Sequence, residues 1–189
     1  MSNKVLIFCA PSGSGKSTIV RHILSLHPEI EFSVSATSRL PRGDEQNGKE
    51  YYFFTPEEFR RLISEDSFVE YEEVYPGRFY GTLKKEVERI WAKGHSLVFD
   101  VDVKGGVNLK RYFGDRALSV FIGVPDPSVL RERLTARGTD SPEEIEKRLQ
   151  KAAEETLYAP QFDTILMNGE LSEAFREAEK LVDDFLKRP

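Results

Sequence analysis

The stretch that decides the fold is VLIFCAPSGSGKSTIV, residues 5–20. It runs from an apolar segment through a glycine-rich loop into a segment whose apolar residues recur at helical spacing. Backbone N–H groups can curl around an anion at the start of a helix, and Gly13 and Gly15 allow the backbone to approach that anion closely. The order of strand, loop and helix therefore predicts a loop that binds nucleotide phosphates, in preference to a chance glycine turn.

Nine consecutive residues form this predicted loop, which we call the phosphate loop. They are Ala10, Pro11, Ser12, Gly13, Ser14, Gly15, Lys16, Ser17 and Thr18. Lys16 would supply positive charge to the β- and γ-phosphates of ATP, and Ser17 would ligate Mg²⁺ together with the nucleotide phosphates and water. The strict motif begins with glycine, whereas this chain has Ala10 there. Cys9, at the end of the strand, is expected to be an inert buried thiol.

Length, charge and cysteine content narrow the class of protein. A chain of 189 residues suits one domain with appendages. The net charge of −5 disfavours a nucleic-acid-binding protein, which would need many cations to neutralise phosphates. One cysteine cannot form a disulfide and suits a reducing cytosol, and the apolar run 5–10 is too short for a signal sequence or a membrane span. We therefore expect a cytoplasmic protein that binds neither nucleic acid nor membrane.

Beyond the loop, short β-rich runs alternate with charged stretches of helical period. The predicted strands are 5–9, 32–34, 97–101, 118–122 and 164–167. Such alternation predicts an α/β fold with a parallel five-stranded sheet flanked by helices. Thr55-Pro56 and Ser141-Pro142 each predict a helix start, because a hydroxyl cap is followed by proline and then by a capping-box glutamate. Residues 33–82 are rich in aromatic runs with glycine turns, which predicts a small mixed-sheet insert.

Two carboxylates end the predicted strand 97–101. Asp100 and Asp102 would lie at the carboxyl edge of the sheet, where open α/β folds bind ligands, and strand alternation aims both at the same face. Acids in or beside an apolar strand need a partner, so solvated strand-end acids are the less favoured alternative. The sequence therefore places both beside the phosphate loop.

The stretch SVSATSRLPRGDEQNGKEYYF, residues 33–53, resembles the guanylate kinase family. The resemblance covers essentially the whole chain and continues through 68–70, 77–82, 100–106, 133–139, 144–149 and 158–159. It implies a nucleoside monophosphate kinase that transfers the γ-phosphoryl of ATP to GMP, giving GDP and ADP, with Mg²⁺ as cofactor. It also implies a P-loop core in residues 1–32, 83–125 and 159–189, a GMP-binding insert in 33–82 and a helical lid in 126–158.

The resemblance carries roles onto individual residues of the GMP site. Those implied for the GMP phosphate are Arg39, Arg42, Tyr51 and Tyr80. Those implied for the guanine base are Ser35, Glu70, Thr82 and Asp102, and the implied GMP site also includes Glu45 and Gly81. The chemistry agrees, because paired arginines offer forked donors to a phosphate dianion and a carboxylate can accept from the N1 and N2 donors of guanine.

A second set of residues is implied for ATP and for the transfer itself. The implied catalytic residues are Lys16, Arg137, Arg148 and Asp100, and Arg133 joins the phosphate loop in binding ATP. Phosphoryl transfer needs positioning and charge neutralisation more than a protein nucleophile, so no covalent intermediate is expected. The chain departs from the family pattern at Asp44, where glycine is common, and at Lys104, where glutamine is usual.

Two alternatives stay open at this stage. A guanylate-kinase-like scaffold module that has lost catalysis is disfavoured by the intact Lys16-Ser17 pair and by the arginines of the lid. A related kinase for another phosphomonoester, such as a sugar phosphate, is disfavoured by Glu70, Asp102 and the run 80–82. The sequence leaves open whether dGMP is accepted and whether the protein is a monomer or a homo-oligomer.

Overall fold

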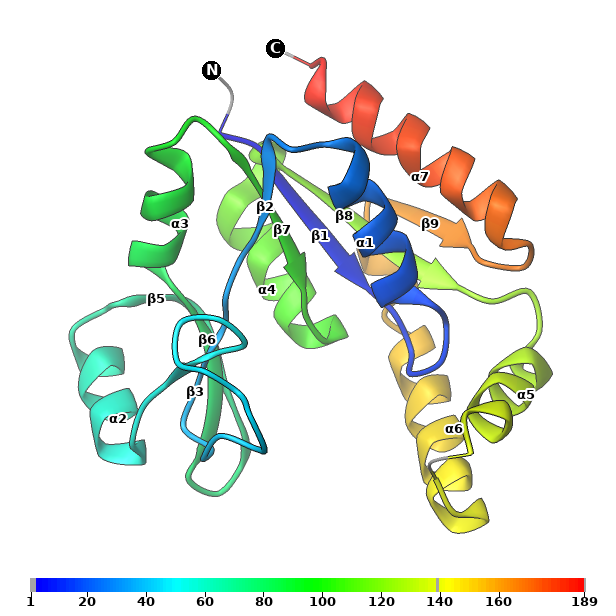
Figure 1. Ribbon diagram of the computed structural model, residues 1–189, viewed down its shortest axis with the longest axis horizontal. Helices are drawn as coiled ribbons and strands as arrows, with labels where there is room; N and C mark the ends of the chain where they lie inside the picture. Colours follow the sequence, from blue (N-terminus) through cyan, green and yellow to red (C-terminus); the bar gives the residue numbers. More distant parts are fainter. Residues whose placement is uncertain (1–2, 139, 189) are drawn as a thin grey trace.

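The computed structural model describes residues 3–138 and 140–188, apart from the side chain of Arg137. Within these residues a five-stranded sheet of order β2-β7-β1-β8-β9 has every neighbouring pair parallel (Figure 1). Its strands are β1 (Val5–Cys9), β2 (Ile30–Phe32), β7 (Ser96–Asp100), β8 (Ala117–Gly123) and β9 (Thr164–Met167). The predicted α/β class with a parallel five-stranded sheet is confirmed.

Helices cover both faces of this sheet. They are α1 (Lys16–Leu26), α3 (Lys84–Trp91), α4 (Val103–Phe113) and α7 (Leu171–Leu186), with short 3₁₀ turns at Gly114–Arg116 and Ala159–Gln161. Leu6 and Phe8 of β1 pack in one apolar cluster with α1 and α7, whereas Val5 and Ile7 pack in a second cluster with α3 and α4. Strand β1 is thus buried on both faces, which fixes the start of the phosphate loop rigidly.

A second sheet of order β4-β3-β6-β5 forms the insert. Its strands are β3 (Ala36–Thr37), β4 (Tyr52–Phe53), β5 (Phe68–Tyr75) and β6 (Arg78–Leu83). The β3–β4 pair is parallel and the other pairs are antiparallel, so the predicted mixed sheet is confirmed. Helix α2 (Pro56–Ser64) covers it by stacking the ring of Phe59 on those of Phe68 and Phe79.

Helices α5 (Pro127–Arg137) and α6 (Pro142–Thr156) pack against each other. They lie across the loop that follows β1 from the insert (Figure 1). Asp126 caps α5 by accepting from the Ser128 N–H, and α5 ends at Gly138 in the left-handed region, with φ of 66°. The capping boxes predicted at the starts of α2 and α6 are both present. None of the described helices combines the length and the apolar content that crossing a bilayer requires.

Two strand predictions need correction at their ends. The strand predicted at 32–34 is β2, Ile30–Phe32, because the Val34 N–H is bound by the carboxylate of Glu86 and is therefore not free for a sheet partner. The strand predicted at 97–101 is β7, Ser96–Asp100. The chain leaves the sheet after Asp100, and Asp102 becomes the cap of α4.

Candidate active site

The phosphate loop connects β1 to the first turn of α1. Gly13 and Gly15 have φ of 90° and 89°, a left-handed conformation that only glycine adopts without strain. Ser14 closes the turn, since its N–H and its hydroxyl both donate to the Pro11 carbonyl. Ala10 has no positive φ, so the missing first glycine of the motif does not disturb the loop.

Lys16, the first residue of α1, is tied to the end of β7. Its ammonium forms an ion pair with Asp100 and donates to the Val101 carbonyl at 3.1 Å. Both side chains of the ion pair are about one-fifth exposed, so they remain open to a ligand. The predicted proximity of Asp100 to the phosphate loop is therefore present in the structure.

The outer side of the loop rests on a residue that the sequence analysis missed. Buried Asn168, directly after β9, donates from Nδ2 to the Ser14 carbonyl at 2.7 Å, and Arg133 of α5 donates to the same carbonyl at 3.3 Å. A Cβ on Gly15 would collide with the Asn168 amide, so glycine is needed there for space as well as for conformation. A polar residue directly after a predicted parallel strand was the available signal for Asn168.

A pocket of about 470 Å³ opens over the loop, and we call it the donor pocket. Besides loop residues, it is lined by Asp100, Val101, Asp102, Arg148, Lys151 and Glu155. Arg148 of α6 reaches the Ser12 hydroxyl at 3.0 Å and Asp140 at 3.2 Å, which places a cation of α6 at this pocket. The Arg137 side chain lies outside the described residues. Lys151 and Glu155, an ion pair with 3.7 Å between Nζ and Oε1, were not predicted.

A second pocket, of about 270 Å³, lies between the insert and the core, and we call it the acceptor pocket. Its lining includes the predicted Ser35, Tyr51, Glu70, Tyr80, Gly81 and Asp102, with Asp100, Val101 and Gly105. It also includes Glu72, Val74 and Tyr75, which the sequence analysis did not single out. Glu72 lies 3.8 Å from Lys104 of α4, so the Lys104 departure gives an ion pair between core and insert.

Glu70 is a half-buried acid of the acceptor pocket. Burial raises its pKa to about 7, and the nearby charges of Asp102 and Glu72 act in the same direction. The Thr82 hydroxyl donates to Glu70 at 2.8 Å, which partly opposes the rise. Gly81 lets β6 approach β5, because a Cβ there would lie 2.7 Å from the Glu70 carbonyl oxygen. A half-buried carboxylate with unsatisfied acceptor capacity suits a ligand that presents paired N–H donors.

Arg39 lies beside the acceptor pocket and is held from two sides. Its guanidinium donates to both carboxylate oxygens of Glu45, at 2.6 and 2.8 Å, and stacks 4.8 Å from the centre of the Tyr51 ring. The hydrogen bonds from Arg39 lower the pKa of Glu45 to about 2. Tyr51 and Tyr80 meet edge to face, so both hydroxyl-bearing rings converge with Arg39. Arg42 is exposed on the loop and is joined to this cluster through its backbone N–H, which Glu45 accepts.

The two pockets share Asp100, Val101 and Asp102 at the carboxyl end of β7. Asp102 accepts from the Gly105 N–H at 2.9 Å, so its position is fixed by the start of α4. A phosphate chain bound on the loop would therefore point toward whatever occupies the acceptor pocket. The arrangement can bring two anionic ligands end to end across one short shared wall.

Comparisons with known proteins agree with this geometry. The family model described as guanylate kinase matches residues 2–185. The chain belongs to the guanylate kinase family. The protein named guanylate kinase from Bacteroides thetaiotaomicron is 53% identical over 188 residues, covering 100% of this chain and 92% of that protein. One from Porphyromonas gingivalis is 50% identical over 186 residues, covering 98% and 99%.

A solved structure extends the family likeness to three dimensions. The crystal structure of guanylate kinase from Anaplasma phagocytophilum matches with a TM-score of 0.74 at 28% identity, covering 99% of this chain and 88% of that one. The match therefore extends over both sheets and over helices α5 and α6. The family and the P-loop fold expected from the sequence are thereby confirmed.

Proposed function

We propose that this chain is a guanylate kinase in activity as well as in family, transferring the γ-phosphoryl of ATP to GMP to give GDP and ADP. The observation that carries the proposal is the shared wall of the two pockets at Asp100, Val101 and Asp102. ATP on the phosphate loop and GMP in the acceptor pocket would face each other there. Direct transfer then needs no covalent intermediate on the protein.

The donor side would be held by backbone and by charge. The N–H groups of the phosphate loop would surround the β-phosphate. Lys16, now paired with Asp100, would turn to the β- and γ-phosphates. Arg148, already at the mouth of the donor pocket, would neutralise charge on the transferring group, as would Arg137 by its place in the family pattern. Arg133 would join the phosphate loop in binding ATP, and its hydrogen bond to the Ser14 carbonyl would hold the loop in place from outside.

The acceptor side would read phosphate and base with different residues. Arg39, Tyr51 and Tyr80 converge where the GMP phosphate would bind, with Arg42 closing over it from the exposed loop and Glu45 holding Arg39 in place. Glu70 would accept from guanine N1 and N2, with Ser35, Thr82 and Asp102 completing the base site. Adenine lacks that pair of donors, and its binding would cover the Glu70 carboxylate and leave it unpaired.

Magnesium suits the donor pocket because oxygen donors gather there. The Ser17 hydroxyl is exposed at the start of α1, and the carboxylate of Asp100 lies across the pocket. No cluster of three metal-binding side chains exists within the residues that the structure describes, so nucleotide phosphates and water would supply the other ligands. Bound with ATP, Mg²⁺ would neutralise charge on the β- and γ-phosphates.

The three-part division gives each region one task. In our proposal the core holds ATP and comprises residues 1–32, 83–125 and 159–189. The insert holds GMP and comprises residues 33–82. The lid, residues 126–158, excludes water from the transfer. The single cysteine is free and buried, which suits the reducing cytoplasm, where we place the protein.

A panel of phosphate acceptors tests the proposal. We expect ADP release with ATP·Mg²⁺ to depend on GMP, with dGMP as a second arm and AMP, UMP, CMP and a sugar phosphate as negative acceptors. Analysis of the nucleotides must show GDP formed in equal amount to ADP. Tight ATP binding without turnover on GMP would favour the scaffold module, and preference for the sugar phosphate would favour the other kinase.

A further inference from the structure

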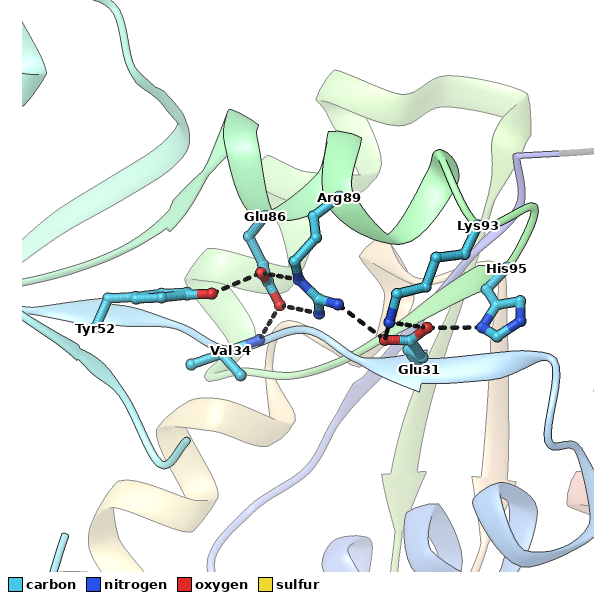
Figure 2. Close-up of polar contacts among 7 residues, drawn as sticks. All are labelled: Glu31, Val34, Tyr52, Glu86, Arg89, Lys93 and His95. Atoms are coloured by element: carbon cyan, nitrogen blue, oxygen red, sulfur yellow. Dashed lines mark hydrogen bonds and ion pairs between the residues drawn. The ribbon is translucent and has the colours of Figure 1, made fainter. Parts of the chain in front are cut away.

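A polar network joins the insert to the core at a point that the reaction does not touch (Figure 2). At its centre is Glu86 of α3, whose side chain is 1% exposed. Its carboxylate accepts from the Val34 N–H at 3.2 Å, from the Tyr52 hydroxyl at 2.9 Å and from Arg89 at 2.8 and 2.9 Å. Every lone-pair direction of this buried acid is therefore directed at a donor.

Two partners of Glu86 are chain neighbours of acceptor-pocket residues. Val34, between β2 and β3, precedes Ser35, and Tyr52 of β4 follows Tyr51. Ser35 and Tyr51 both line the acceptor pocket. The Tyr52 N–H donates to the Ser35 carbonyl at 2.9 Å, so the two segments are also tied directly to each other. One carboxylate thus fixes both segments that carry these pocket side chains.

The other side of the network is anchored in the core. Arg89 bridges from Glu86 to Glu31 of β2, with 3.1 Å between its Nη1 and Oε2. Lys93 donates to Glu31 at 2.9 Å, and His95 Nδ1 lies 2.7 Å from the same carboxylate (Figure 2). Arg89 therefore ties Glu86 to the edge strand of the five-stranded sheet. Glu86 can keep its place in the core while it holds the two segments of the insert.

The charges favour an ionised Glu86. Burial alone would raise its pKa, but the hydrogen bonds from Arg89, the Val34 N–H and Tyr52 outweigh burial and leave the pKa below its ordinary value. Burial and Glu86 raise the pKa of Tyr52, so the tyrosine keeps its proton and donates it. The contact is a charge-assisted hydrogen bond, which is stronger than a neutral one.

We propose that Glu86 is a positioning residue for the acceptor pocket: through Val34 and Tyr52 it holds Ser35 and Tyr51 where they meet the acceptor nucleotide. This inference rests on the proposed function only in naming GMP as that nucleotide. It predicts that loosening the network weakens GMP binding while the phosphate loop, built on β1 and α1, keeps its affinity for ATP.

The test uses Tyr52→Phe, which removes one hydroxyl and leaves the ring, and Glu86→Gln, which removes the charge. The control is Glu88→Gln, on the exposed side of the same helix. We expect Tyr52→Phe to weaken GMP binding about 3- to 10-fold, less than the loss of a charge-assisted hydrogen bond made directly to the ligand, because Tyr52 acts through Tyr51. The ATP dissociation constant should change less than twofold. The control should match wild type in both constants. The loss of GMP affinity in the double variant should be smaller than the two single losses added together, because both changes weaken the Glu86–Tyr52 contact.

A readout independent of GMP separates this inference from the proposed function. The Val34 amide should exchange slowly with solvent deuterium in wild type and in Glu88→Gln, and faster in Glu86→Gln. Failure of the wild-type protein to phosphorylate GMP would overturn the proposed function. Slow exchange at Val34 would even then support the contact by which Glu86 holds this segment. Wild-type GMP affinity in folded Tyr52→Phe, or equal losses for GMP and ATP, would overturn the positioning role. If Glu86→Gln does not fold, Tyr52→Phe decides.

Discussion

The phosphate loop takes its shape from nine consecutive residues, whereas the acceptor pocket gathers side chains from two sheets and a helix. The loop relies on backbone geometry, with Gly13 and Gly15 at positive φ between a buried strand and a helix. The pocket relies on charged side chains that neighbouring residues keep in position. Arg39 is held by its hydrogen bonds to Glu45, and Glu70 is held by the hydroxyl of Thr82. A fault in the loop should therefore abolish function, while a fault in the pocket should reduce selectivity by degrees.

The largest effect should come from Lys16→Ala. Removing the ammonium that neutralises the β- and γ-phosphates should lower kcat by about 10³-fold, the cost of losing a main charge-stabilising group. Lys16→Arg should rescue only part of this loss, because a planar fork does not replace a compact ammonium. Lys84→Ala, which breaks the surface pair with Asp66, is the control and should keep wild-type turnover. Near-normal kcat in folded Lys16→Ala would contradict the proposed kinase activity.

A loop substitution that leaves every charge in place should come next. Gly15→Ala adds one methyl where φ is 89° and where Asn168 fills the space. Such strain costs about 1–3 kcal/mol, so ATP affinity measured by calorimetry should fall about 10-fold or more. Gly43→Ala also stands at positive φ but meets no atom within 4 Å, and should leave ATP affinity unchanged. Equal ATP affinities in the two variants would remove the steric role of Asn168.

The acceptor pocket should show its dependence on Glu70 through pH. With a pKa of about 7, Glu70 loses its charge as pH falls from 8 to 6, and only the ionised form accepts from both guanine donors. The KM for GMP should therefore rise about 10-fold over this range, with the KM for ATP nearly constant. Glu70→Gln should lower kcat/KM for GMP at least about 10-fold at pH 8 and flatten this profile. An unaltered profile in Glu70→Gln would assign the titration to another group.

The smallest effect is on stability. A raised folded-state pKa means that the folded protein binds the Glu70 proton more tightly than the unfolded chain, so stability is lost as pH rises from about 4.5 through about 7. Glu70→Gln should escape this loss and raise the free energy of unfolding by about 1–3 kcal/mol at pH 8. At pH 4 the two proteins should unfold alike in a denaturant titration. Lower stability of Glu70→Gln at pH 8 would contradict the burial argument.

The same contrast explains how far the sequence could predict the molecule. The loop, the caps of α2 and α6 and the five parallel strands are local patterns, and each was placed to within about two residues. Asp102 was expected on a strand, but the sheet ends at Asp100, where the capping of α4 takes over. The positions of the strands along the chain follow from periodicity, whereas their exact ends follow from such competing contacts.

What the sequence could not supply are contacts between distant segments. Asn168 meets Ser14 across 154 residues, and Glu86 meets Val34 across 52, so no window of sequence contains either pair. Glu86 also looks like one more helix-surface acid until the insert covers it. The pairing of Glu45 with Arg39 is closer, yet its forked geometry depends on the loop between them.

The central claim is that donor and acceptor pockets meet at the end of β7, and a single bridging ligand tests it most directly. Adenosine and guanosine joined 5′ to 5′ through a chain of five phosphates can occupy both pockets only if they share that wall. Calorimetry should then give a dissociation constant at least about 100-fold below that of ATP, since the second contact becomes intramolecular. Both Lys16→Ala and Glu70→Gln should weaken it. Affinity no better than that of ATP, or indifference to Glu70→Gln, would contradict the account.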